Sequence, residues 1–547
     1  MISFMNVRLP IIIFLFLLIL SIEADLGPII TLPDGTKLLG IKDDVKNVLS
    51  FKGIRYAEAP VGNFRWRPPV IYVNKDINDL VNATKFGNHC IQDIWPNGSE
   101  DCLFLNVFIR DSADLSTADR PVVVFIHGGS YISGSAKFYS GEDIVDYWNG
   151  NAVVVTLDYR LNVFGFLGSY ELKNRDTDYH SCGNYGIQDQ RMGFEWIRQN
   201  IRAFGGSAEK LTIMGQSAGG GSVSNHLTMK KSWQYVTGGA IIESGSFAEW
   251  SAQSLSRAQD IYDQYLQVLN CIDINCLLGK TTEEVYDAHK LIQYNDGDIY
   301  LSPFVPTVDS VEMTTHPWLA LSMGEIADVP LLQGTNADEG LLFTALDQRR
   351  RVSESELIDY WKNEKKYSNI DILKLSELYV IGKEDSYPSS GHDNITTTQW
   401  WALMRSTGDS LFSCPAKYAS QQLSKRKSKL YMYHFEYASL MSSYVNHGAE
   451  LPYVFHWKLG TKSNIDVADM MSSYFANFVI NENHDINGQS FEGEMSSLPI
   501  WPVYTYDTDE LLVLSTPEKT KSVSGLKTKE CEFHIAHIDA SIRRNFS

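Results

Sequence analysis

The chain has 547 residues, 44% of them hydrophobic, and a formal net charge of −19 at pH 7. So large an excess of acidic side chains argues against nucleic acids and anionic membrane surfaces as partners, because both carry negative charge. The apolar content is ample for a large buried core.

The N-terminal residues have the pattern of a secretory signal peptide. Arg8 precedes an apolar run at residues 11–20, and the small residue Ala24 follows. A run of this length fits a signal peptide, whereas a membrane span needs about 20 apolar residues. We expect a signal peptide at 1–24 and one mature domain at 25–547. The C-terminus has no apolar tail for a lipid anchor, so we expect a secreted, extracellular protein without a stable membrane anchor.

The cysteines and the glycosylation sequons agree with export. Seven cysteines in an oxidising compartment predict disulfide pairs with one cysteine left over. Short spacing favours pairing of Cys90 with Cys102 and of Cys271 with Cys276. Three cysteines stay open at this point: Cys182, Cys414 and Cys531. N-glycosylation sequons stand at Asn82, Asn97, Asn394 and Asn545.

Strand-like and helical segments alternate along the chain. Apolar, largely β-branched runs are typical of strands buried on both faces of a sheet. Such runs occur at 122–126, 152–157, 211–214 and 329–332. Residues 188–201 have the periodicity of a helix. The alternation predicts one α/β domain, a large, mostly parallel mixed sheet covered by helices, with long helical insertions after residue 217.

A short glycine-containing motif follows the first of these strands. Residues 122–126 run into His127-Gly-Gly-Ser130. Glycines directly after a buried strand let backbone N–H groups point into a cleft, which is what a developing oxyanion requires. In isolation the motif is equally typical of an ordinary turn.

A second motif is typical of a catalytic serine. Residues 211–214 run into Gly215-Gln-Ser-Ala-Gly219, followed by small residues suited to the start of a helix. A serine on a sharp turn between strand and helix is the nucleophile elbow of α/β hydrolases. A chain of this length contains about 0.2 such motifs by chance, so the motif needs supporting partners. It predicts Ser217 as the nucleophile of an ester or amide hydrolase.

The acid and the base of such a site follow the serine in the chain. Asp338 and Glu339 stand on the loop after the strand at 329–332, and the residues alone do not choose between them. His447 lies on a glycine-containing loop and is the favoured base. Its competitors are His392, His434 and His456, of which His434 lies in a strand-like segment.

Several further motifs, in a fixed order, carry a family resemblance. They stand at 51–60, 65–69, 99–107, 158–166, 183–190 and 204–206, and the last lies near Trp501. With these motifs the chain resembles the type-B carboxylesterases, the carboxylesterase and cholinesterase family of the α/β-hydrolase fold. The resemblance covers nearly the whole mature chain.

The resemblance implies a role for each residue of the site. It implies Ser217 as nucleophile, His447 as base and Glu339 as acid, because the family acid directly precedes a glycine, here Gly340. The implied oxyanion hole consists of the N–H groups of Gly129, Ser130 and Ala218. Ser130 stands where the family has a third glycine. Its backbone N–H group is kept, and we expect its side chain to narrow the substrate pocket. No cofactor and no metal ion are implied.

The resemblance also implies the disulfides Cys90–Cys102 and Cys271–Cys276, with Cys414–Cys531 as a long-range third pair. Cys182 is then the free thiol.

Two departures from the family pattern bear on the substrate. Gln216 stands before the nucleophile where relatives mostly carry Glu, and the Cys90–Cys102 loop is short. Both argue against a cationic ester such as acetylcholine. We expect neutral, hydrophobic esters, xenobiotic or lipid-like, as substrates and organophosphates or carbamates as covalent inhibitors. The resemblance is strongest to insect carboxylesterases. Alternatives are a juvenile hormone esterase-like enzyme, a slow scavenger, and a binding or adhesion protein of the same fold.

Overall fold

The structure is a computed structural model that describes residues 27–76, 80–292, 302–344, 351–383, 397–439, 444–457, 462–481, 483–487 and 499–546. Its centre is an eleven-stranded sheet in the order β16-β15-β14-β13-β10-β9-β7-β8-β6-β4-β3. The strands from β15 to β8 run parallel, and antiparallel strands complete both edges. This is the mostly parallel mixed sheet that the sequence predicts.

The strands of this sheet span the following residues, in chain order: β3 Ile41–Asp43, β4 Val48–Arg55, β6 Phe104–Arg110, β7 Arg120–Ile126, β8 Val153–Leu157, β9 Gly206–Gln216, β10 Ala240–Glu243, β13 Leu331–Asn336, β14 Leu430–Phe435, β15 Glu510–Leu514 and β16 Lys521–Ser524. A smaller sheet joins β1 (Ile29–Thr31), β2 (Lys37–Leu39) and β5 (Leu80–Asn82), and a two-stranded sheet joins β11 (Gln253–Ser254) and β12 (Thr307–Val308).

Both faces of the central sheet are buried, and successive residues of β7 show why. Val122 and Val124 belong to the apolar cluster on one face, whereas Val123 and Phe125 belong to the cluster on the other. Side chains alternate between the faces of a strand, so a strand covered on both sides must be apolar throughout. The continuous valine run of this segment therefore fits a central strand.

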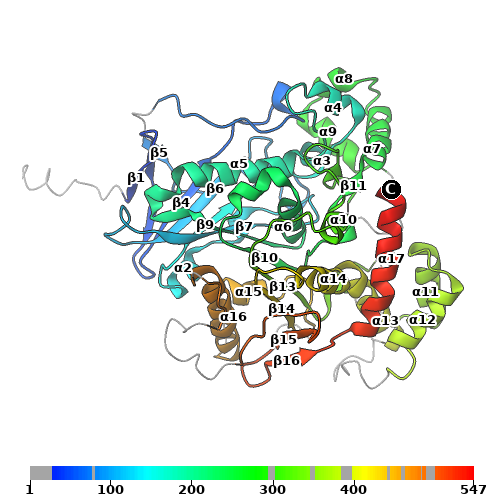
Figure 1. Cartoon of the computed structure of the whole chain (residues 1–547). Helices are drawn as coiled ribbons and strands as arrows, with labels where there is room; N and C mark the ends of the chain where they lie inside the picture. The colour runs from blue at the N-terminus through cyan, green and yellow to red at the C-terminus, as the bar shows by residue number, and fades with distance from the viewer. Residues whose placement is uncertain are drawn as a thin grey trace, which may run out of the picture.

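Helices cover each face (Figure 1). The cluster on one face draws residues from α5 (Tyr185–Asn200), α6 (Ala218–Thr228), α10 (Pro317–Ser322), α14 (Cys414–Leu423) and α17 (Thr528–Phe546). The opposite cluster draws residues from α2 (Glu142–Tyr147), α15 (Leu451–Val454) and α16 (Lys462–Ile480). Among the described residues, no helix is both long enough and apolar enough to cross a membrane.

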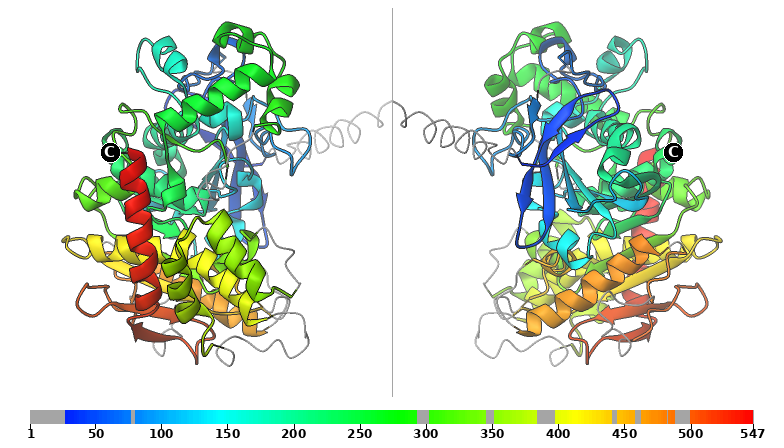
Figure 2. Two further views of the ribbon diagram at one scale, coloured as in Figure 1. Left: turned by 90° about the vertical axis from the view of Figure 1, so that its right-hand side faces the viewer. Right: turned by 90° about the vertical axis from the view of Figure 1, so that its left-hand side faces the viewer.

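Helical insertions follow residue 217, as the sequence predicts. The segment between β10 and β13 contains α7 (Leu255–Val268), α8 (Ile274–Leu278) and α9 (Thr282–His289). The segment between β13 and β14 contains α11 (Glu354–Asp359), α12 (Asn369–Tyr379) and α13 (Thr398–Gly408), which share an apolar cluster of their own. The C-terminal helix α17 runs along this second insertion (Figure 2) and contributes Phe533 to its packing.

Several predicted boundaries differ from the structure by a few residues, and two of these differences have a clear physical reason. Strand β13 begins at Leu331 rather than at residue 329, because Pro330 has no N–H group for a sheet hydrogen bond. Strand β9 begins at Gly206, five residues before the predicted run, because Arg120 pairs with Gly206 across the sheet. Pairing with a neighbouring strand extends a strand beyond its apolar run, which sequence periodicity does not show.

Three disulfides join Cys90 to Cys102, Cys271 to Cys276, and Cys414 to Cys531, and Cys182 is a buried free thiol. Of the sequon asparagines, Asn82, Asn97 and Asn545 are exposed. Asn394 and the expected signal peptide at 1–24 lie outside the described residues.

The long-range disulfide ties α14 to α17 and closes a loop of 117 residues. Replacing both Cys414 and Cys531 by Ala should lower the free energy of unfolding by about 5 kcal/mol, because the unfolded chain gains the freedom of a long loop. The matched double variant of Cys271 and Cys276, whose separation is only five residues, should lose about 2 kcal/mol. Urea unfolding of both variants measures the difference. Equal losses would contradict the loop-entropy explanation.

Candidate active site

Ser217 occupies the sharp turn between β9 and α6. Its φ of 58° and ψ of −123° form a conformation that residues with a side chain rarely adopt. Two glycines make the turn sterically possible. A Cβ atom on Gly215 would lie 2.4 Å from the backbone of Gly219, and one on Gly219 would lie 2.0 Å from the carbonyl oxygen of Ile126. The packing of the turn against β7 therefore holds the serine in a strained backbone conformation.

Hydrogen bonds hold the backbone on both sides of this serine. The Ser217 N–H donates to the carbonyl of Glu243 at 2.8 Å, and its carbonyl accepts from the N–H of Gly221 at 2.8 Å. These bonds join the turn to β10 and to the first turn of α6. Ser217 itself is 4% exposed.

A buried carboxylate and an imidazole lie beside the turn. Glu339 begins the short 3₁₀ helix after β13, and its Oε2 lies 2.6 Å from Nδ1 of His447. Its other oxygen accepts from the Ser244 hydroxyl at 2.5 Å and from the backbone N–H of Asn336 at 2.7 Å. The Glu339 side chain is 1% exposed. Three donors therefore fix the carboxylate that orients the ring.

The other candidate acid has different partners. Asp338 accepts from the Arg405 guanidinium at 3.3 Å and from the backbone N–H of Val445 at 3.0 Å. Asp338 thus holds the loop that carries His447 but does not pair with the imidazole.

The other candidate histidines are also engaged elsewhere or lie outside the description. His434 is buried in β14, where desolvation holds the pKa of its ring well below the usual value. His456 pairs with Asp469 at 2.7 Å and stacks on Tyr147. His392 lies outside the described residues.

The loop after β7 lies against the serine turn. A Cβ atom on Gly128 would come within 2.8 Å of the Ser217 Cβ atom. The N–H groups of Gly129, Ser130 and Ala218 donate no hydrogen bond within the described part of the chain. Ala218 is the first residue of α6, whose N-terminus attracts negative charge. These three donors remain available for an anion beside Ser217.

Gln216 makes a contact that sequence reasoning missed. Its side-chain Nε2 lies 3.1 Å from Nε2 of His447. No hydrogen bond joins the Ser217 hydroxyl to that ring among the described residues. The bond from Ser244 to Glu339 was also missed, because nothing in a Glu-Ser-Gly-Ser segment reveals a partner so far away in the chain.

Two further carboxyl groups lie buried behind the His447 loop. Glu243 is the sheet neighbour of Gln216, and burial, followed by the charge of Glu450, raises the pKa of Glu243 well above its usual range. Burial, followed by the charge of Glu339, raises the pKa of Glu450. The buried ring of Tyr433 lies near these two carboxyl groups. It packs across Gly334, where a Cβ atom would be 2.2 Å from the ring.

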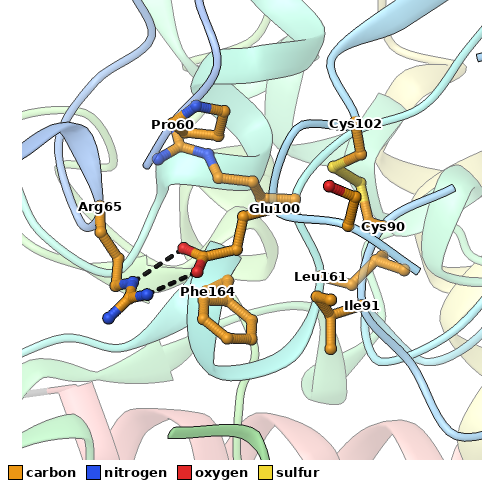
Figure 3. A pocket seen from close by; sticks show the side chains of 10 residues that line it. Pro60, Arg65, Cys90, Ile91, Glu100, Cys102, Leu161 and Phe164 are labelled. Atoms are coloured by element: carbon orange, nitrogen blue, oxygen red, sulfur yellow. Dashed lines mark hydrogen bonds and ion pairs between the residues drawn. A yellow bond between two sulfur atoms is a disulfide. The ribbon is translucent and has the colours of Figure 1, made fainter. Parts of the chain in front are cut away.

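A separate pocket lies under the Cys90–Cys102 disulfide and contains none of the candidate catalytic residues (Figure 3). Its charged wall is the buried ion pair of Arg65 with Glu100 at 2.5 Å. Within the described residues, no group of three or more His, Cys, Asp or Glu side chains could hold a metal ion.

A parallel sheet with a serine on the turn after a central strand defines an α/β hydrolase, and the Glu–His pair beside that turn makes it a serine hydrolase. Residues 27–534 match the carboxylesterase family, and the chain belongs to that family. The protein is thus a carboxylic ester hydrolase.

Known relatives and solved structures agree with this assignment. The chain is 30% identical to a para-nitrobenzyl esterase of Bacillus subtilis, over 87% of this chain and 93% of the relative. It is 29% identical to a cholinesterase of Mus musculus, over 89% of this chain and 82% of the relative. The solved structure of a carboxylesterase of Geobacillus stearothermophilus superposes with a TM-score of 0.76 and 28% identity, covering 92% of this chain and 99% of that one.

The raised pKa of Glu243 predicts a pH-dependent stability. Well below pH 4.5, this carboxyl is protonated in both the folded and the unfolded chain. As the pH rises, the unfolded chain ionises first, so wild type loses stability relative to Glu243→Gln by up to about 1.4 kcal/mol per pH unit. Urea unfolding of both proteins at pH 4.5, 6 and 8 measures the gap. A gap that stays constant across these pH values would show that the folded protein does not retain the proton.

Proposed function

We propose that the protein is a secreted serine carboxylesterase that hydrolyses neutral, hydrophobic carboxylic esters through an acyl-enzyme on Ser217. The observation that carries the proposal is the 2.6 Å contact between Glu339 and Nδ1 of His447, next to a strained serine turn. A carboxylate accepts but does not donate, so Nδ1 carries the ring proton and Nε2 keeps the lone pair that a base requires.

In the first step, His447 takes the Ser217 hydroxyl proton as Oγ attacks the ester carbonyl. The Glu339 carboxylate stabilises the imidazolium. The ring then gives its proton to the departing alcohol, which leaves an acyl group on Oγ. In the second step, His447 takes a proton from water, the hydroxide oxygen attacks the acyl carbon, and the proton returns to Ser217 as the carboxylic acid departs.

The oxyanion formed in each step is assigned to the N–H groups of Gly129, Ser130 and Ala218. Their lack of partners within the described chain supports this role. One such donor is worth about 3 kcal/mol of transition-state stabilisation. The backbone N–H of Ser130 serves despite its side chain, and that side chain narrows the space beside the scissile bond.

Three features support a neutral, apolar substrate. Gln216 is uncharged, so no carboxylate directly precedes the nucleophile to attract a cation. The rings of Phe343 and Phe412 lie 5.0 and 4.6 Å from the His447 ring, which gives the base an apolar surround. Trp95 in the short disulfide loop stacks on Phe138 at 4.1 Å and is taken up in packing.

Export of the protein is supported by the apolar run at 11–20, the exposed sequons and the three disulfides. On this proposal residues 1–24 are removed, and residues 25–547 form a single domain. Organophosphates and carbamates should act as covalent inhibitors, because they react with an activated serine.

The segment around His447 supports an enzyme of the insect carboxylesterase type. A juvenile hormone esterase-like activity is the second candidate, favoured by Gln216 at the serine motif. A slow scavenger would use the same residues and differs only in its turnover rate. The presence of serine, glutamate and histidine together disfavours a binding or adhesion protein that lacks catalysis.

Ser217→Ala should lower the turnover of a naphthyl acetate by at least about 10⁴-fold, because the acyl-enzyme cannot form. The matched control, Ser322→Ala, alters an exposed serine and should keep wild-type turnover. Initial rates at equal protein concentration measure both variants. Equal rates in wild type and Ser217→Ala would refute the role of this serine.

The uncharged Gln216 beside the nucleophile predicts that a positive charge on the substrate brings no advantage. Acetylthiocholine and its uncharged 3,3-dimethylbutyl isostere have the same acyl group and shape. We expect kcat/KM for the neutral ester to equal or exceed that for the cation. A preference of tenfold or more for acetylthiocholine would contradict the proposed substrate class.

A further inference from the structure

The side-chain amide of Gln216 lies between two loops of the site. A Cβ atom on Gly128 would be 2.9 Å from the Gln216 Oε1, and one on Gly448 would be 3.6 Å from its Nε2. The amide is thus confined between the loop after β7 and the loop that carries His447. Gln216 is 4% exposed, so the packing rather than solvent determines how the amide is oriented.

In this orientation the amide nitrogen faces the base. Nδ1 of His447 donates to Glu339 at 2.6 Å, so Nε2 carries a lone pair and no proton in the neutral ring. The Gln216 Nε2 lies 3.1 Å from that lone pair and is a donor. The same lone pair must later accept the Ser217 proton.

The charged and titratable groups around the imidazole come from the elements packed against it. They are Glu339, Glu450 with Glu243 behind it, and the ion pair of Asp338 with Arg405. The two aromatic rings that contact the imidazole, Phe343 and Phe412, carry no charge. Gln216 is therefore the neutral polar side chain that meets Nε2 of the ring directly.

We propose that Gln216 is a positioning residue that caps Nε2 of His447 in the free enzyme and so favours the neutral imidazole. The inference rests on the proposed function, because only a neutral ring can accept the Ser217 proton. A donor amide stabilises a lone pair, whereas a carboxylate in the same place would stabilise the imidazolium instead. The cap opens as Ser217 approaches, and the enzyme keeps its active protonation state to lower pH than it would with glutamate at this position.

The test compares wild type with Gln216→Met and Gln216→Glu. Methionine keeps the length and neutrality of the side chain but removes the donor, and glutamate keeps the shape but adds a charge. The pH profile of kcat/KM for a neutral naphthyl ester is measured from pH 5 to 9, with active sites counted by a fluorophosphonate. Partial misfolding lowers the amplitude of such a profile but does not move its acid limb.

We expect the acid limb to move to higher pH by about half a unit in Gln216→Met, the equivalent of one lost neutral hydrogen bond. In Gln216→Glu it should move by about one to two units. Gln422→Glu adds the same charge at a site beside Lys425 and should leave the limb in place.

An acid limb that is identical in wild type and both Gln216 variants would overturn the inference. A shift of Gln216→Met to lower pH would do the same, since the amide would then stabilise the imidazolium through its oxygen. Turnover that survives in Ser217→Ala would instead overturn the proposed function, and this inference with it.

Discussion

The positive φ of Ser217 is the constraint on which the rest of the site depends. A side-chain residue in such a conformation costs about 1–3 kcal/mol, and it persists only where the surrounding structure leaves no alternative. Here the backbone of Gly219 packs directly on the carbonyl of Ile126, and the Ser217 N–H is bound to β10. The residues on either side of Ser217 are held with it: Ala218 is the first residue of α6, and the amide nitrogen of Gln216 lies 3.1 Å from Nε2 of His447. In the proposed mechanism, one turn of the chain therefore carries the nucleophile, one oxyanion donor and the side chain that caps His447.

The carboxyl ends of neighbouring parallel strands bring the remaining groups to one edge of the sheet, where such sheets bind ligands. Gln216 ends β9, Glu243 ends β10 beside it, and Glu339 follows β13. The uncharged Gln216 directly precedes Ser217 in the chain, and the ionisable Glu243 is its neighbour across the sheet. In Glu243, burial and the neighbouring Glu450 disfavour the ionised form. Glu243 therefore adds little negative charge to this edge of the sheet, and the carboxylate that pairs with the His447 ring is that of Glu339.

Much of the fold and the core of the site were predictable from sequence because they depend on local patterns. The valine runs define central strands, and the glycines around Ser217 define a turn that few other residues allow. The choice of Glu339 over Asp338 needed the family resemblance, since both stand on the same loop. The contact of Gln216 with His447 spans 231 positions and depends on how two loops pack, so no periodicity or spacing reveals it.

The central claim is that an acyl group resides on Ser217 during turnover. Mass spectrometry of the protein, quenched in acid while it hydrolyses a slowly deacylating ester, tests this claim most directly. We predict one acyl adduct per chain, located on the peptide that contains Ser217 and lost again when the ester is exhausted. Continued turnover without an adduct, or with an adduct on a different residue, would contradict the mechanism.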